Sequence, residues 1–303
     1  MVLDHLVDLF DDFTGVARIG LGLAAVGRPG YINLGRTRDL PPDRTTEAMR
    51  DRAHDLMDRA YAAGVRYFDA ARSYGRAEEF LASWLPGHDR AVAGSKWGYT
   101  YTADWRVTAD VHEVKDHGVA AFDRQITESR ALLGDGLALY QIHSVTPDSP
   151  ALTDRELHRR LAGQGAVVGL STSGPAQADA IRAALAIEVD GHSLFRSVQA
   201  TWNLLEPSAG PALAEAHAAG VAVIVKEAMA NGRLADRDTT ALAAALHQPW
   251  ATIVLSGAAT TAQLDSNLQA ATVTLSDTDL EQLNTLAEPA ADYWKTRSGL
   301  PWT

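Results

Sequence analysis

The chain repeats one pattern along most of its length: a short apolar run followed by a longer segment with helical periodicity. Such alternation is typical of parallel β/α units, and eight units are the number that closes a barrel. The eight apolar runs, which we predict to be strands, are Ile19–Leu23, Arg66–Asp69, Ala91–Lys96, Leu137–Ile142, Val167–Ser171, Ser197–Thr201, Ala222–Lys226 and Ile253–Leu255.

Helical segments fill the intervals, and several end at a glycine in the position of a C-cap, as at Gly64 and Gly220. Neither a flexible linker nor a shift in composition divides the chain, so we predict an α/β fold, a (β/α)8 TIM barrel, as one domain over residues 1–303. The predicted helices are Thr46–Ala63, Ala77–Leu85, Val119–Leu133, Thr153–Ala162, Pro175–Ala186, Pro211–Ala219, Thr239–Leu246 and Thr261–Ala270.

Three segments are longer than ordinary barrel connections: Gly27–Arg44, Trp97–Gly118 and the tail Glu288–Thr303. The loops that follow strands build the active sites of such barrels, so the first two are candidate walls of a substrate site. Ser276–Ala287 has the pattern of an additional helix near the C-terminus, with Ser276 as its N-cap.

Composition narrows the classes of function. With 27 Lys+Arg against 38 Asp+Glu, the formal net charge of −11 disfavours nucleic acid and anionic membrane surfaces as partners. The chain has 0 Cys and lacks a basic leader or a long apolar stretch, which fits a cytoplasmic protein without a targeting segment. We therefore expect a small-molecule ligand and leave the oligomeric state open.

Four polar residues follow consecutive predicted strands. Asp69 ends the second strand and Tyr74 lies in the loop behind it, while Lys96 ends the third strand and His143 follows the fourth. Strand C-termini meet at one mouth of a barrel, so these side chains are expected to converge. Each one alone has an ordinary structural explanation, such as a turn residue, a surface charge or a packing ring, but their order favours a site.

This set suits proton donation to a carbonyl oxygen. A tyrosine has an ordinary pKa of about 10, and a neighbouring ammonium group lowers that value. Lys96 would supply this charge for Tyr74, with Asp69 pairing Lys96 and His143 orienting the carbonyl. If a hydride reaches the carbonyl carbon, Tyr74 delivers the proton.

The segment from Gly64 to Ala71, together with Tyr74, Gly75 and Glu78, resembles the signature of the aldo-keto reductase family. The resemblance extends over nearly the whole chain. It implies Tyr74 as general acid, with Asp69, Lys96 and His143 as the other catalytic residues. It also implies a nicotinamide cofactor lying across the barrel mouth, with NADP as the family default and NAD as the alternative.

The resemblance also carries a set of cofactor contacts. Ser171 and Thr172 correspond to the strand end that holds the nicotinamide carboxamide, with Thr172 where Asn is usual, and Gln199 matches a second amide contact. Ordinary barrel-lining polar residues are the alternative interpretation of these positions. After the seventh strand, Lys226 stands where an aromatic side chain usually stacks on the nicotinamide, and Gly232 belongs to the same cofactor loop.

Two further features depart from the family pattern. Glu227 would repel a pyrophosphate unless Lys226 or Arg233 compensates its charge. The stretch beginning at Ser256 and Gly257 resembles the phosphate cradle of the family. Asn267 matches the asparagine on its adenine side, but Ala259 and Gln263 replace cations that hold an adenosine 2′-phosphate, which is why NAD stays an alternative.

Aromatic residues in the long loops favour an apolar or ring-shaped substrate, and we predict Tyr31 and Trp97 as contacts. Two other motifs are unconvincing. A glycine-rich stretch at Gly20 is interrupted too early for a Rossmann fingerprint. His112 and His117 are spaced wrongly for a zinc helix, so we expect a solvated loop without a metal.

We therefore predict an NAD(P)H-dependent reductase acting on an aldehyde or ketone. A second hypothesis is a barrel that binds the nicotinamide nucleotide for regulation or redox sensing with negligible turnover, motivated by the unusual cofactor wall at Lys226 and Glu227. A third is a Schiff-base aldolase using Lys96 or Lys226, which would need no cofactor.

Overall fold

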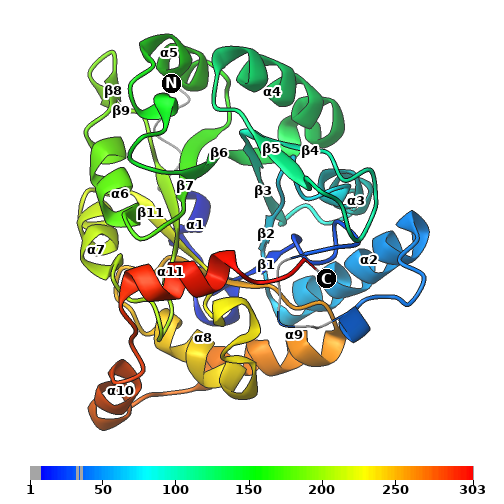
Figure 1. Ribbon diagram of the computed structural model, residues 1–303, viewed down its shortest axis with the longest axis vertical. Helices are drawn as coiled ribbons and strands as arrows, with labels where there is room; N and C mark the ends of the chain where they lie inside the picture. Colours follow the sequence, from blue (N-terminus) through cyan, green and yellow to red (C-terminus); the bar gives the residue numbers. More distant parts are fainter. Residues whose placement is uncertain (1–7, 32–33, 35–36, 303) are drawn as a thin grey trace.

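The computed structural model describes residues 8–31, 34 and 37–302. At its centre is a closed barrel of parallel strands, in which each barrel strand pairs with the next along the chain and the last pairs with the first (Figure 1). This confirms the predicted (β/α)8 fold. The barrel strands are β1 (Ile19–Gly22), β2 (Tyr67–Asp69), β3 (Val92–Trp97), β6 (Leu137–Val145), β7 (Val167–Thr172), β10 (Ser197–Thr201), β11 (Ala222–Lys226) and β12 (Ile253–Ser256).

The largest difference from the predicted strand boundaries is in β6. Its pairing with β7 shifts register between Ile142 and Val145, and Ser144 within this bulge has a positive φ of 55°. The strand therefore continues to Val145 and contains His143, which the sequence places just beyond the strand. Bulges of this kind often lie beside active sites, where they change the direction of a side chain.

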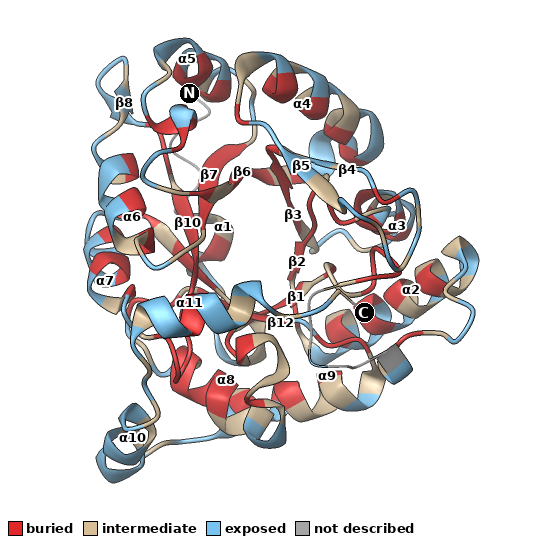
Figure 2. Ribbon diagram, in the orientation of Figure 1, coloured by how far each residue is buried: buried red, intermediate tan, exposed pale blue. Residues whose placement is uncertain are grey.

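Helices surround the barrel with a buried side toward the strands and an exposed side toward solvent (Figure 2). Helix α5 begins two residues later than predicted because Asp154 acts as its N-cap and accepts from the backbone N–H groups of Glu156 and Leu157. The wall helices are α2 (Thr46–Ala63), α3 (Ala77–Trp84), α4 (Val119–Leu133), α5 (Arg155–Ala162), α6 (Gln177–Leu185), α7 (Gly210–Ala218), α8 (Asp238–Leu246) and α9 (Thr261–Leu268).

The N-terminal end of the barrel is closed by a short helix, α1 (Asp8–Asp11). Phe10 of this helix is buried and packs edge-on against the Tyr67 ring, with ring centroids 5.4 Å apart. Leu139 and Ile253, at the start of their strands, belong to the same apolar cluster. With this end plugged, the polar residues at the other ends of the strands face the open mouth.

Several elements outside the barrel shape that mouth. The predicted additional helix is present as α10 (Asp277–Asn284), begun by a capping box between Ser276 and Asp279. The tail contains a further helix, α11 (Ala290–Ser298), which the sequence analysis did not predict and which crosses the mouth in Figure 1. Two hairpins were also missed: β4 (Tyr99–Tyr101) with β5 (Glu113–Lys115), and β8 (Glu188–Val189) with β9 (His192–Ser193).

Across the described part of the chain, each helix is too short or too polar to cross a lipid bilayer.

Candidate active site

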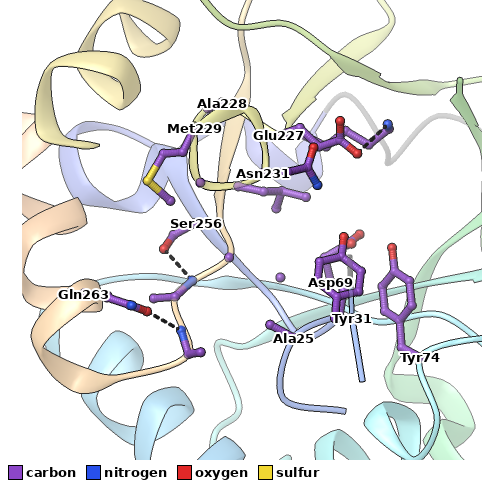
Figure 3. Close-up of a pocket in the computed structure, with 18 of the residues that line it drawn as sticks. Ala25, Tyr31, Asp69, Tyr74, Glu227, Ala228, Met229, Asn231, Ser256 and Gln263 are labelled. Atoms are coloured by element: carbon purple, nitrogen blue, oxygen red, sulfur yellow. Dashed lines mark hydrogen bonds and ion pairs between the residues drawn. The ribbon is translucent and has the colours of Figure 1, made fainter. Parts of the chain in front are cut away.

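A cavity of about 570 Å³ lies at the C-terminal ends of the barrel strands. Tyr74 and Asp69 lie at one end of it, and Ser256 and Gln263 at the other, with Met229 of the loop after β11 along one side (Figure 3). The cavity is therefore elongated, with a tyrosine at one end and the start of α9 at the other.

The loop that carries Tyr74 is fixed by close contact between two backbone turns. A Cβ atom on Gly27 would lie 2.4 Å from the carbonyl oxygen of Tyr74, and one on Gly75 would lie 2.5 Å from the carbonyl oxygen of Gly27. Gly75 also has a positive φ of 59°, which glycine adopts without strain. The backbone N–H of Arg76 donates to the Gly27 oxygen at 2.8 Å, so the two loops hold Tyr74 in place.

Three of the four predicted catalytic residues meet beneath the cavity. Lys96 is fully buried, forms an ion pair with Asp69 and donates to the Tyr74 hydroxyl at 3.4 Å and to the carbonyl oxygen of Ala70 at 3.0 Å. The other oxygen of Asp69 accepts from the Tyr67 hydroxyl and from the Gln199 amide, each at 3.0 Å. Asp69 is therefore held from several sides, and it fixes the ammonium group under the tyrosine.

The electrostatic setting of Tyr74 differs from the one predicted. Burial, and next the negative charge of Asp69, raise the pKa of the Tyr74 hydroxyl well above its ordinary value. The predicted net lowering of this pKa is wrong for the free protein, because burial and the charge of Asp69 outweigh the effect of the neighbouring cations. Tyr74 therefore carries its proton across the neutral pH range.

Arg28 is the cation that opposes this rise in the pKa of Tyr74. Its buried guanidinium lies 4.7 Å from the Trp302 ring, 5.1 Å from the Tyr31 ring and 5.3 Å from the Tyr74 ring. It donates to the Glu113 carboxylate at 2.9 Å. The sequence analysis missed Arg28, because the loop Gly27–Arg44 contains four arginines and nothing in the sequence distinguishes Arg28 from the other three.

His143 completes the predicted set at the cavity. Its ring meets the Tyr74 ring edge to face, with centroids 5.5 Å apart, and its Nδ1 lies 3.5 Å from the Ser73 hydroxyl. Burial, followed by the charges of Lys96 and Lys226, lowers its pKa well below the ordinary value. His143 is thus a neutral imidazole, which can donate one hydrogen bond without carrying charge.

The loop containing His117 is not the solvated segment that we predicted. His117 is buried, and its Nε2 lies 2.8 Å from the backbone oxygen of His143, while His112 stacks on Trp302 with centroids 4.1 Å apart. Burial is the main cause that lowers the pKa of His117 to about 4. These two histidines therefore pack into the wall of the site. The described residues contain no cluster of side chains suited to a metal ion.

In the loop after β11, neighbouring cations compensate the negative charge of Glu227. Burial would raise the pKa of this carboxyl, but Lys226 and Arg297 lower it to about 2. Arg297 of α11 makes a two-pronged contact with Glu227, and Lys226 Nζ lies 3.7 Å from the same carboxylate and donates to Thr201 at 2.8 Å. Arg233, one of the two predicted compensating residues, instead pairs with Glu288.

At the far end, the turn after β12 leads into α9. Ser256 and Gly257 line the cavity, and a Cβ on Gly257 would meet no atom within 4 Å. Thr260 caps the helix by accepting from the Gln263 N–H at 3.2 Å, which leaves the first two N–H groups of α9 without intrahelical acceptors. The helix start therefore presents free donors and a positive dipole end to an anion.

A comparison with known families bears on this geometry. The model of the aldo/keto reductase family matches residues 18–245. The chain belongs to the aldo/keto reductase family. A search of curated proteins finds no match.

Solved structures agree with this membership. The chain is similar to a Pseudomonas aeruginosa protein provisionally named an aldo-keto reductase, with 25% identity and a TM-score of 0.65 over 89% of this chain and 98% of that one. It also resembles an aldo-keto reductase from Bacillus halodurans in its holo form, with 21% identity and a TM-score of 0.68 over 90% and 93% of the two chains. The second likeness concerns the fold alone.

Within this aldo/keto reductase barrel, most predicted site residues line the cavity, and three predictions need correction. Trp97 is fully buried against Phe122, with ring centroids 5.1 Å apart, and does not line the cavity as a substrate contact would. Strand side chains alternate in direction, so Lys96 faces the barrel and its neighbour Trp97 faces α4. The predicted residues that do line the cavity are Tyr31, Asp69, Tyr74, His143, Gln199, Lys226, Gly232, Ser256, Gly257, Gln263 and Asn267.

Ser171 and Thr172 are the other two corrections. Both are fully buried and do not line the cavity. Ser171 accepts from the backbone N–H of Ser144 at 2.8 Å, and Thr172 donates to Gln177 of α6 at 3.2 Å. Ser144 and Ser173 line the cavity in their place. The β6 bulge that exposes Ser144 could not be predicted from the sequence.

Proposed function

We propose that this aldo/keto reductase barrel reduces an aldehyde or ketone to an alcohol, with a nicotinamide cofactor and with Tyr74 as the proton donor. The observation that carries the proposal is the buried Asp69–Lys96 ion pair, whose ammonium donates to the Tyr74 hydroxyl at the wall of the cavity. A protonated tyrosine backed by a fixed cation is suited to give up its proton to an oxygen that gains negative charge.

The cavity residues fit a dinucleotide. The free N–H groups at the start of α9 and the open space at Gly257 suit a phosphate, and Lys226 is a cation in the middle of the same cavity. At the tyrosine end, Gln199 donates to Asp69, and Ser144 and Ser173 line the wall nearby, so these three would hold the carboxamide. When bound, a reduced nicotinamide supplies a hydride to the carbonyl carbon.

The chain's own groups handle the oxygen. His143, a neutral imidazole beside Tyr74, would donate a hydrogen bond to the carbonyl oxygen and orient it. As that oxygen becomes an alkoxide, Tyr74 transfers its proton, and the phenolate that forms is stabilised by Lys96. Arg28 lies close enough to the Tyr74 ring to stabilise the same phenolate.

The structure weakens the case for a purely regulatory barrel. That hypothesis was motivated by the unusual cofactor wall at Lys226 and Glu227, and the charge of Glu227 is compensated because Arg297 and Lys226 both lie against its carboxylate. A Schiff-base aldolase would depend on Lys226, because burial is the main cause that lowers its pKa to about 8, whereas Lys96 is committed to Asp69.

The experiment is to incubate the protein with NADH or NADPH and a panel of small aldehydes and ketones, and to measure both nucleotide oxidation and alcohol formation. The proposal predicts that the two rise together. Tight nucleotide binding without oxidation would favour the regulatory barrel. Borohydride trapping of an aldehyde on Lys226, in the absence of nucleotide, would favour the aldolase.

A further inference from the structure

The two ends of the cavity differ in charge. A hydride donor has to lie beside Tyr74, so on the proposed function the rest of a dinucleotide extends toward the start of α9. Among the described residues, the charged side chains that line that far end are the carboxylates of Asp39 and Asp238. The described cations that line the cavity contact groups elsewhere: Arg28 is beside Tyr74, and Lys226 and Arg297 are beside Glu227.

Asp39 is held at the cavity by a relay through α9. Gln263 donates from Nε2 to the Asp39 carboxylate at 2.7 Å, and its Oε1 accepts from the Ala259 N–H at 2.9 Å (Figure 3 shows the second contact). Gln263 thus uses both ends of its amide to join Asp39 to the turn that follows β12. The side chain that stands where a cation was expected serves instead to position an acid.

Arg52 of α2 also reaches this region, but its guanidinium donates to backbone carbonyl oxygens. It donates to the carbonyl oxygens of Asp39 at 2.7 Å and of Ala259 at 2.8 Å, and it does not line the cavity. It therefore ties the turn of Asp39 to the turn after β12 rather than facing a ligand.

Asp238, at the start of α8, is the second acid. Its Oδ1 accepts from the Thr239 N–H at 2.7 Å. With the Asn267 amide oriented to satisfy its neighbours, Asn267 donates to Asp238 Oδ2 at 3.0 Å and accepts from the Ser256 hydroxyl at 2.7 Å. Both acids are thereby fixed by amide side chains of α9.

We propose that Asp39, with Asp238, selects the unphosphorylated adenosine ribose of NAD(H) over the 2′-phosphate of NADP(H). Ribose hydroxyls are donors that a carboxylate accepts, and in Rossmann folds an Asp or Glu recognises the ribose in this way. A 2′-phosphate would bring negative charge against these acids, with none of the described cations lining this end to bind it. The inference rests on the proposed function, because that function fixes which end receives the adenosine.

The test is to measure dissociation constants of NADH and NADPH by quenching of tryptophan fluorescence, and of adenosine 5′-monophosphate and adenosine 2′,5′-bisphosphate by calorimetry. We expect NADH to bind at least about tenfold more tightly than NADPH, which corresponds to a difference of about 1.4 kcal/mol in binding free energy. The two fragments should differ in the same direction, independently of any turnover.

Two variants make the test specific. Asp39→Asn removes the charge of the carboxylate. The ratio of the NADPH dissociation constant to the NADH dissociation constant should fall by about tenfold, mainly because NADPH binds more tightly. Asp236→Asn removes the same charge from an exposed residue of the turn before α8, outside the cavity lining, and should leave the ratio unchanged.

Wild-type protein that binds NADPH as tightly as NADH, or an Asp39→Asn variant with an unchanged ratio, overturns this inference while leaving the proposed function intact. If neither nucleotide nor either fragment binds, the proposed function and the inference both fail. The two failures are therefore distinguishable.

Discussion

The two ends of the cavity are built in different ways. At the tyrosine end, Asp69, Lys96 and His143 belong to barrel strands and are buried. At the α9 end, the two acids lie outside the barrel strands: Asp39 ends a single 3-10 turn and Asp238 begins α8. Asp39 is joined to Gln263 across 224 positions of sequence. The barrel thus fixes the tyrosine end, whereas packing outside the barrel sets the charge of the α9 end, which can change without disturbing the barrel.

The largest expected effect tests the tyrosine end. Lys96→Met should lower turnover by about a thousandfold, because Tyr74 loses the cation that stabilises its phenolate. Asp69 is left with a buried charge, so NADH binding is measured on the same sample as a check of folding. Lys295→Met, an exposed residue of α11, is the control and should keep full turnover. Normal turnover in Lys96→Met would contradict the assigned arrangement.

The next prediction tests the wall between the two ends. Glu227→Gln leaves the guanidinium of Arg297 without its carboxylate, which should lower the free energy of unfolding by about 2 kcal/mol. Glu288→Gln breaks the more exposed pair with Arg233 and should cost less than about 1 kcal/mol. Urea denaturation measures both values, and equal losses would argue against a structural role for the contact between Glu227 and Arg297.

The sequence predicts the tyrosine end well because its information is local. Asp69, Lys96 and His143 each lie at the end of an apolar run, and a barrel brings those ends together. The error at Trp97 arose because adjacent strand residues face opposite sides. Thr172 was mispredicted for the same reason, since it faces α6.

The rest depends on long-range contacts that no local pattern encodes. Arg297 contacts Glu227 across 70 positions of sequence, from a helix that the sequence of the tail did not predict. Arg28 is recognised as part of the site only in the structure, where its guanidinium lies over the rings of Tyr31 and Trp302. Asp39 at the α9 end was missed because it lies in a long loop whose path is set by packing against α9.

A smaller effect is expected at Arg28. Arg28→Met removes a cation that lowers the pKa of Tyr74, so this pKa should rise further and the weaker acid should reduce turnover by about tenfold. The alkaline limb of the profile of kcat against pH should move to higher pH. Arg50→Met on α2 is the control, and an unshifted profile in Arg28→Met would remove Arg28 from the proton-delivering end.

The smallest effect concerns Lys226. Burial is the main cause that lowers its pKa to about 8, so NADH affinity should weaken by about threefold between pH 7 and pH 9 as the ammonium loses its charge. Because this pKa lies below the 10.5 of a free lysine, the stability contributed by this residue is complete above pH 10.5 and is lost as the pH falls through about 8. Fluorescence titration of Lys226→Met should show an NADH affinity that does not depend on pH. If the affinity of this variant still falls between pH 7 and pH 9, a group other than Lys226 causes the pH dependence.

Stopped-flow comparison of the wild-type protein with Tyr74→Phe tests the central claim most directly. Tryptophan fluorescence reports binding of NADH, and nucleotide absorbance reports hydride transfer to an aldehyde in the same reaction. We predict that the binding phase is unchanged in Tyr74→Phe, whereas the hydride-transfer phase slows by about a thousandfold. Hydride transfer at the wild-type rate in Tyr74→Phe would contradict the assignment of Tyr74 as the proton donor.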